Sequence, residues 1–273
     1  MGLKDKMEDA AVQLASKSYD DLAKPAAQDA GKLLGAVTGF FNHVVTAPLH
    51  KLNARFEIQT KAYIENLQKQ YLDIPVENRQ EPALNIVGPT LEALRYNLDE
   101  EELKEMFTNL LLSSMDNRVS QNCHPAFVEI IKQLNSNDAK LLKALAERCK
   151  IRKGDYPLVM PKCVINKSPT TNKYTEYIGG LFPEVYIAIQ VEGLSIFDIS
   201  KSLHSLERVG VVEINNVTPL VREDLYDKLE RAEEIRTLFD DKAKTGIDCG
   251  LIFFRRSYRF TEYGEDFVNS CVN

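Results

Sequence analysis

Residues 81–116 read EPALNIVGPTLEALRYNLDEEELKEMFTNLLLSSMD, and they indicate a helical protein. Their apolar side chains recur at intervals of three and four, which is the period of an α-helix and not of a strand. Leu91 and Leu94 line a first predicted helix. Asp99 can cap a second one, with Glu102 three residues on to complete a capping box. The stretch therefore predicts two consecutive amphipathic helices.

Helical patterns continue on the amino-terminal side and a little beyond the carboxyl end of this stretch. An amphipathic pattern over 51–72 and another over 124–134 each predict a helix. Pro89, with Gly88 before it, suits the first turn of the helix that follows. We therefore expect residues 1–133 to form an α-helical region.

Beyond residue 134 the pattern mixes helices with strands. Gly210 suits the end of a helix that leads into a strand. A hairpin is predicted around residues 255–257, followed by a closing helix. This order is typical of a winged helix, so the predicted fold class is mainly α, with a winged-helix-like α+β domain over 134–273. The predicted helices span 137–148, 196–209, 219–241 and 262–271, and the strands 158–165, 211–214, 250–254 and 258–261.

Charge and cysteine content restrict the class of protein. The chain has 273 residues and a net charge of −6. Residues 71–133 carry eleven acidic and five basic side chains, so this segment accounts for the whole net charge. Such a balance argues against attraction of the entire protein to nucleic acid or anionic lipid. The five cysteines form no CxxC pair, and residues 1–19 lack the apolar core of a signal peptide, so we expect a cytoplasmic protein.

Residues 31–50, GKLLGAVTGFFNHVVTAPLH, contain no charged side chain after Lys32. Gly31, Gly35 and Gly39 repeat at every fourth position and would share one face of a helix, followed by Phe40 and Phe41. Close packing inside the helical region, conditional insertion into a membrane and contact between copies are the three interpretations. A helix over 31–47 would be ~25 Å long, which is short for a membrane span.

The sequence contains no recognisable catalytic motif. The EF-hand, Walker A, HExxH, GxSxG and Rossmann patterns are all missing, so we expect no catalytic residue, metal or cofactor. His124 and Glu129 lie ~140° apart on a helix and do not share a face. His124 with Pro125 is better interpreted as the start of a helix.

Basic residues in the second half suggest an alternative function. Arg255, Arg256 and Arg259 fall on the predicted wing, beside aromatic residues. Arginines at such a position can contact phosphates or enter a minor groove. The helix that would read DNA carries Lys201, His204 and Arg208, but also two acidic residues. A winged-helix DNA-binding regulator is therefore the alternative to a protein-contact or structural role, and an enzyme with an unrecognised site is a third.

The same helical stretch carries a family resemblance. Residues 81–116, followed by HPAFVEIIKQLNSNDAKLLK at 124–143, are similar to the core signature of the Abi-alpha (abortive infection) family. IPVENRQEP at 74–82 resembles the family's preceding loop, and RFTEYGEDFVNSC at 259–271 its closing segment. Within 81–133 the signature residues include Pro82, Glu102, His124, Pro125, Phe127 and Glu129.

That resemblance implies a function in bacterial defence against phage and assigns no catalytic residue. We expect a non-enzymatic defence protein that senses infection through contact with a phage or host protein or with nucleic acid. The effector step is expected from the amino-terminal helices, acting on a membrane through residues 31–50. In that case the cytoplasmic protein would become membrane-associated on activation.

Overall fold

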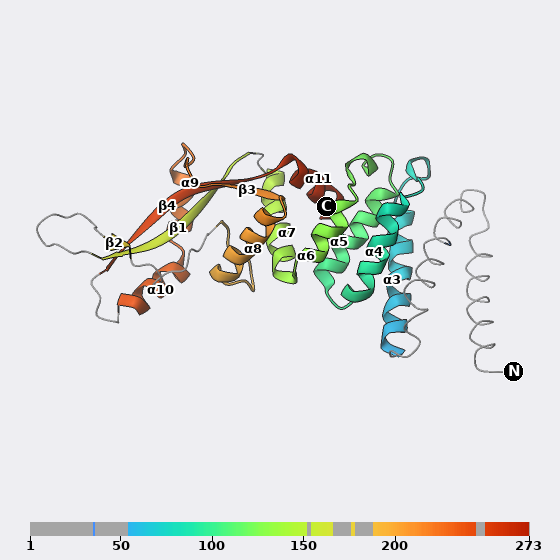
Figure 1. The fold of residues 1–273 in the computed structure, drawn as a ribbon, viewed down its shortest axis with the longest axis horizontal. Helices are drawn as coiled ribbons and strands as arrows, with labels where there is room; N and C mark the ends of the chain where they lie inside the picture. Colours follow the sequence, from blue (N-terminus) through green and yellow to red (C-terminus); the bar gives the residue numbers. More distant parts are fainter. Residues whose placement is uncertain are drawn as a thin grey trace, which may run out of the picture. The chain divides into compact units, whose positions relative to one another are not determined.

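A computed structural model describes residues 35, 54–151, 154–165, 176–177, 188–243 and 249–272 (Figure 1). Contacts divide the chain into two compact units. The first comprises residues 1–99 and 107–128, and the second 100–106 and 129–273. The expected domain boundary at 133–134 stays a prediction.

The first unit is built from helices, as its periodicity predicts. Its elements include α3 (Ala54–Leu72), η3 (Val76–Asn78), α4 (Leu84–Asn97) and η4 (Ser120–Asn122). Most of α5 (Glu101–Ser114) and the start of α6 (Ala126–Gln133) also belong to it. On α3, Tyr63, Leu67 and Tyr71 recur every four residues and are buried. Thr108 on α5 donates a hydrogen bond to the Tyr63 phenol at 3.1 Å, and burial raises the pKa of that phenol.

The start of α4 corrects one expectation. Pro89 was expected in the first turn, but α4 begins five residues earlier, so the proline lies inside the helix. Its ring is exposed, and Thr90 beside it donates from Oγ1 to the carbonyl of Ile86 at 2.6 Å. A proline inside a helix removes one hydrogen bond of the helical ladder, here the one to the carbonyl of Asn85.

In the second unit, α7 (Ser136–Ile151) packs against α8 (Ile196–Arg208). Ser205 on α8 donates to the Asp138 carboxylate at 3.0 Å. The start of α8 is held by a capping box, in which Ser195 Oγ accepts from the Asp198 N–H and the Asp198 carboxylate accepts from Ser195. The Ser195 hydroxyl also lowers the pKa of Asp198.

A four-stranded antiparallel sheet follows the order β2-β1-β4-β3. Because strands 1 and 4 are neighbours, residues far apart in sequence meet at Val159↔Arg255 and Tyr156↔Tyr258. The two tyrosine rings stack with centroids 5.3 Å apart. The bounds are β1 Tyr156–Ile165, β2 Glu176–Tyr177, β3 Val212–Asn215 and β4 Cys249–Phe260.

The predicted hairpin around residues 255–257 is wrong. Cys249–Phe260 forms one continuous strand, in which Arg255 and Arg256 lie in the middle, paired with Val159 and Leu158. Successive residues of a strand point to opposite faces, so Phe254, Tyr258 and Phe260 share one face, and Arg255 and Arg259 the other. Arg255–Ser257 therefore did not need to be a turn. The expected single helix over 219–241 is instead two, α9 (Asp224–Glu230) and α10 (Glu233–Ala243).

The helices α9 and α10 cover one face of the sheet. Tyr226 and Ile235 are fully buried and share a hydrophobic cluster with Val159 of β1 and Ile196 of α8. At the other end of the unit, α11 (Glu262–Cys271) starts where sequence analysis placed it. Thr261 caps it by accepting from the Gly264 N–H at 2.8 Å.

Candidate functional site

Two connections of the first unit meet at the ends of its helices. Residues 73–83 join α3 to α4, and residues 115–125 join α5 to α6. Arg79 and Asp116 form a β-bridge between them. Gln80 donates its N–H to the Met115 carbonyl at 2.9 Å, and Asn117 donates to the Asn78 carbonyl at 2.8 Å. The loop and the helical signature of the family resemblance are therefore in direct contact.

Charged side chains of these two connections form hydrogen bonds within them. Arg79 donates to the carbonyls of Ile74 at 2.9 Å and Leu72 at 3.0 Å, and lies 5.0 Å from the centroid of the Tyr71 ring. Asp116 is largely buried and accepts from Arg118 Nε at 2.9 Å. These hydrogen bonds from Arg118 hold the pKa of the Asp116 carboxyl below its usual value.

A cleft of 260 Å³ opens between the two connections and the first turn of α4. Its lining contains amide, hydroxyl, thiol and apolar groups but no charged side chain. The sequence does not predict this cleft, because its lining comes from two segments that are separate in the chain. The only signal was the polar character of the loops. The lining residues are Gln80, Ala83, Asn85, Ile86, Ser114, Ser120, Gln121, Cys123 and Pro125.

Backbone groups at the start of α4 add to the polar character of this cleft. Ala83 occupies the N-cap position and provides no side-chain hydrogen bond. The Ile86 N–H already donates to the Ala83 carbonyl at 2.9 Å, and the apolar cap provides no side-chain acceptor for the N–H groups before it. Pro89 has no N–H to donate to the carbonyl of Asn85, and Asn85 is one of the residues that line the cleft. The cleft can therefore form hydrogen bonds with a peptide main chain.

The six signature residues play different structural parts. Pro125 lines the cleft, and Pro82 is buried in the adjoining connection. His124 Nδ1 accepts the Ala126 N–H at 3.1 Å, which is the helix-starting role expected for it. Phe127 is fully buried.

The two acidic signature residues lie in the second unit, and each is paired with a lysine. Glu102 contacts Lys140 at 3.3 Å, and Glu129 contacts Lys132 at 2.9 Å. A backbone hydrogen bond lowers the pKa of Glu102, and Lys140 lowers it further. Among the described residues, no three His, Cys, Asp or Glu side chains are grouped to hold a metal.

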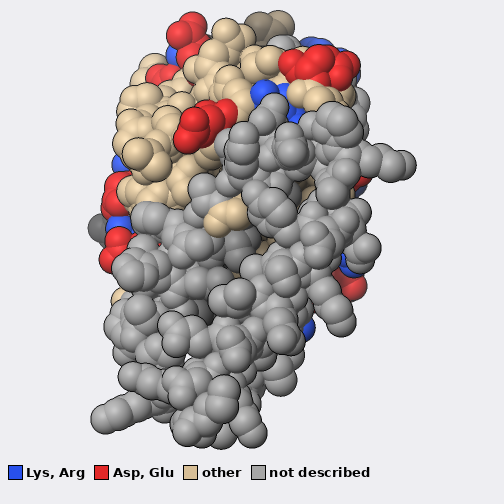
Figure 2. Space-filling view, turned by 90° about the vertical axis from the view of Figure 1, so that its right-hand side faces the viewer, with Lys and Arg blue, Asp and Glu red and all other residues tan. Residues whose placement is uncertain are grey.

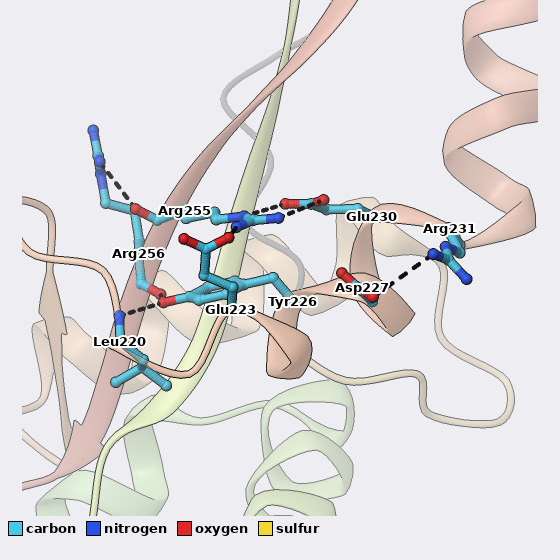
Figure 3. A network of polar contacts seen from close by, with 8 residues as sticks. All are labelled: Leu220, Glu223, Tyr226, Asp227, Glu230, Arg231, Arg255 and Arg256. Carbon is cyan, nitrogen blue, oxygen red and sulfur yellow. Dashed lines mark hydrogen bonds and ion pairs between the residues drawn. The ribbon is translucent and has the colours of Figure 1, made fainter.

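Arg255 of the second unit is enclosed by acidic groups (Figure 3). Its Nε and Nη2 donate to the two oxygens of Glu230 at 2.7 and 3.1 Å, and Nη1 donates to Glu223 at 3.2 Å. The guanidinium lies 5.2 Å from the centroid of the Tyr226 ring. The bonds to Glu230 raise the pKa of Arg255. Its charge is thus balanced within the protein.

Arg259 is also balanced by carboxylates. Its Nε and Nη2 both donate to Glu213 Oε2, at 2.9 and 2.7 Å. It lines a hollow of 120 Å³ together with Glu213 and Asp155, so acidic groups outnumber basic ones there. Arg256 instead donates to the Arg255 carbonyl at 3.1 Å and lies over the Phe254 ring. The structure does not gather these three arginines into one basic patch.

Lys201, His204 and Arg208 are exposed on α8. His204 lies 3.6 Å from Glu207, and Arg208 donates to the Gln133 side chain at 2.9 Å. Their assignment to nucleic-acid binding, like that of the β4 arginines, stays a prediction.

Of the residues assigned to membrane contact or helix packing, Gly35 alone is described. It is helical and exposed. Gly31, Gly39, Phe40 and Phe41 lie outside the described residues. Within the part of the chain that the structure describes, no helix has both the length and the apolar character needed to cross a membrane.

The fold defines a class of protein before any comparison is made. Over the described residues it is a mainly α-helical protein with an antiparallel sheet, an uncharged cleft and arginines bound to carboxylates. The family model of abortive infection alpha matches residues 55–271, so the chain belongs to that family. Comparisons with curated proteins and with solved structures gave no match.

Proposed function

We propose that this chain is a non-enzymatic factor in abortive-infection defence against phage, and that it acts by binding a protein partner. One observation carries the proposal. The family match runs from residue 55 to residue 271 and so includes the described helices of the first unit and nearly all of the second. Defence by abortive infection is therefore attributed to the protein as a whole and not to a small shared motif.

The choice of protein over nucleic acid as the partner follows from the charges. Arg255 and Arg259 are each bound to carboxylates, so phosphate contact would require breaking ion pairs. The cleft of the first unit, by contrast, has an uncharged lining with hydrogen-bonding groups and apolar side chains. Clefts of this composition suit peptides or apolar side chains of a partner.

We also propose that the second unit is a winged-helix-like domain with a long insertion. Support comes from the strand order β1-β4-β3 and from α8, which directly precedes β3. In this interpretation the wing is the connection between β3 and β4, and α9 and α10 are part of it. The insertion is bound to the sheet by Arg255 and Tyr226.

For the effector step, we propose that the protein acts from the cytoplasm and associates with membrane on activation through residues 31–50. The support is the sequence, because residues 33–50 carry no charge. Leakage of dye from liposomes would measure this step directly. The purified wild-type chain should release dye, and Gly35→Leu/Gly39→Leu should release less, because bulky side chains prevent close helix contact.

Phage plating efficiency tests the defence function itself. Bacteria that express the wild-type chain should form fewer plaques than bacteria with an empty vector. The Gly35→Leu/Gly39→Leu variant should restore plating if the amino-terminal helices carry the effector step. Equal plating with and without the wild-type chain, across a panel of phages, would rule out defence.

A further inference from the structure

The surface around the uncharged cleft is apolar at one side. Leu84 lies between the lining residues Ala83 and Asn85 and is 81% exposed. Val76, in the connection that bounds the cleft, is 53% exposed. Single exposed apolar residues are common, but here they adjoin a cleft with hydrogen-bonding groups. A partner segment could therefore bury apolar side chains while its main chain meets the cleft.

The same connection is acidic at its surface. Asp73, Glu77 and Glu81 are all exposed. The cations of the two connections are already engaged, because Arg79 is bound to backbone carbonyls and Arg118 to Asp116. The cleft thus has an uncharged lining, and the connection that bounds it carries three exposed carboxylates. On the side of the molecule shown in Figure 2, Asp and Glu are also more prominent than Lys and Arg over the described surface.

We infer that this cleft binds an extended segment of a partner protein that has apolar residues at its centre and Lys or Arg at its ends. Gln80 Nε2 already donates to the Ser114 carbonyl at 3.0 Å, so its Oε1 serves the main chain of the segment, together with the Gln121 amide and the start of α4. Leu84 contacts its apolar side chains, and Glu81 attracts its basic ends. Complementary charge favours encounter and suppresses acidic partners. The inference rests on the proposed function, because it names the class of partner that the defence protein binds.

Binding can be measured with the full chain and synthetic peptides of about ten residues, which span roughly 30 Å when extended. Fluorescence anisotropy would compare a labelled peptide with a Val/Leu centre and Lys ends to one with the same centre and Glu ends. A third peptide keeps the Lys ends and has a Gly/Ser centre. The first peptide should bind about tenfold more tightly than either of the others, and its affinity should fall as salt screens the charges.

Two variants and two matched controls locate the binding. Leu84→Ser and Glu81→Lys should each weaken binding of the first peptide by about five- to tenfold. Val221→Ser changes an apolar residue that is 99% exposed in the second unit, and Glu92→Lys changes an exposed carboxylate further along α4. Both controls should bind like wild type. All four positions are exposed, so the variants should fold.

The inference is overturned if the Lys-ended and Glu-ended peptides bind equally, if none of the peptides binds, or if Leu84→Ser and Val221→Ser behave alike. Sedimentation adds a further check. A wild-type dimer that Leu84→Ser dissociates would make a second copy of the chain the occupant instead. Peptide binding is measured without phage, so the two proposals can fail separately. If the first peptide binds but bacteria with and without the wild-type chain plate equally, the defence function is wrong and the assignment of the cleft to peptide binding is retained.

Discussion

Arg255 and Arg259 lie four residues apart on β4, but their surroundings differ. The Arg255 and Glu230 side chains are 29% and 19% exposed, whereas more than half of the Arg259 and Glu213 side chains is in solvent. A partly buried two-point ion pair contributes more than an exposed one. We expect Arg255→Ala to lower the free energy of unfolding by about 1–2 kcal/mol. Arg259→Ala should have a smaller effect, and urea unfolding compares the two variants.

Equal losses for the two variants would mean that the contacts of Arg255 with Glu223 and Glu230 add no more stability than the exposed pair of Arg259 with Glu213. A second variant separates the charge from the packing. Arg255→Met keeps an unbranched apolar side chain over the Tyr226 ring and removes the ion pairs. It should retain part of the stability that Arg255→Ala loses.

Asp116 should make the first unit sensitive to acid. Its hydrogen bonds with Arg118 depress its pKa in the folded chain. The stabilisation is complete above the unfolded-state value of about 3.9 and is lost as pH falls through the lower folded-state value. Asp116→Asn should therefore lower stability at neutral pH, and the gap between variant and wild type should narrow below about pH 4. A difference in stability between variant and wild type that stays constant from pH 7 to pH 3 would contradict an origin in the ionised Asp116 carboxylate.

At the scale of the element, α11 depends on one glycine. A Cβ built on Gly264 would lie 1.9 Å from the carbonyl oxygen of Val211, which is backbone and cannot turn aside. Thr261 holds the start of the helix against the same backbone segment. Its hydroxyl donates to the Gly210 carbonyl at 2.7 Å and accepts the Gly264 N–H as the helix cap. Gly264→Ala should therefore cost at least about 2–3 kcal/mol. Thermal unfolding followed by circular dichroism would measure the loss.

Gly35→Ala is the matched control for this substitution. Gly35 is helical and exposed, and a Cβ there meets nothing within 4 Å. Alanine is the better helix former by about 1 kcal/mol, so this variant should be as stable as wild type or slightly more so. If both variants unfold at the same temperature, the contact with Val211 is not a constraint.

The elements that sequence predicts well are those with a strong local signal. The closing helix has Thr261 at its cap and buries Phe267 and Val268, so residues 262–271 could be assigned from periodicity alone. Pro89 led to a wrong prediction of where α4 begins, because this helix tolerates a proline on its exposed side. The hairpin was predicted with strands over 250–254 and 258–261 and a turn at residues 255–257. Pairing with Val159, which lies almost a hundred residues away, makes the segment a strand, and no local pattern reveals such a partner.

The candidate sites show the same limit at the scale of the whole molecule. Sequence alone marked Arg255 and Arg259 as basic, but their carboxylate partners come from α9 and β3. The cleft was not predicted, because its lining is assembled from segments 73–86 and 114–125 by backbone pairing. The sequence did identify Pro125 and the segments that contain the cleft, through the family resemblance. The family match over 55–271 confirms that resemblance.

The charges of the whole molecule lead to a prediction about the DNA-binding alternative. The net charge is −6, and Arg255 and Arg259 are already bound to carboxylates. Affinity for DNA depends on phosphates neutralised by unpaired Lys and Arg, and it is strongest at low salt. We therefore expect the purified chain to retain no duplex DNA in filter binding even at about 50 mM salt. The Arg255→Ala/Arg256→Ala variant should behave in the same way. Retention that weakens with salt, and a salt slope that this variant reduces, would instead favour a DNA-binding regulator, with Arg255 released from Glu223 and Glu230 on binding.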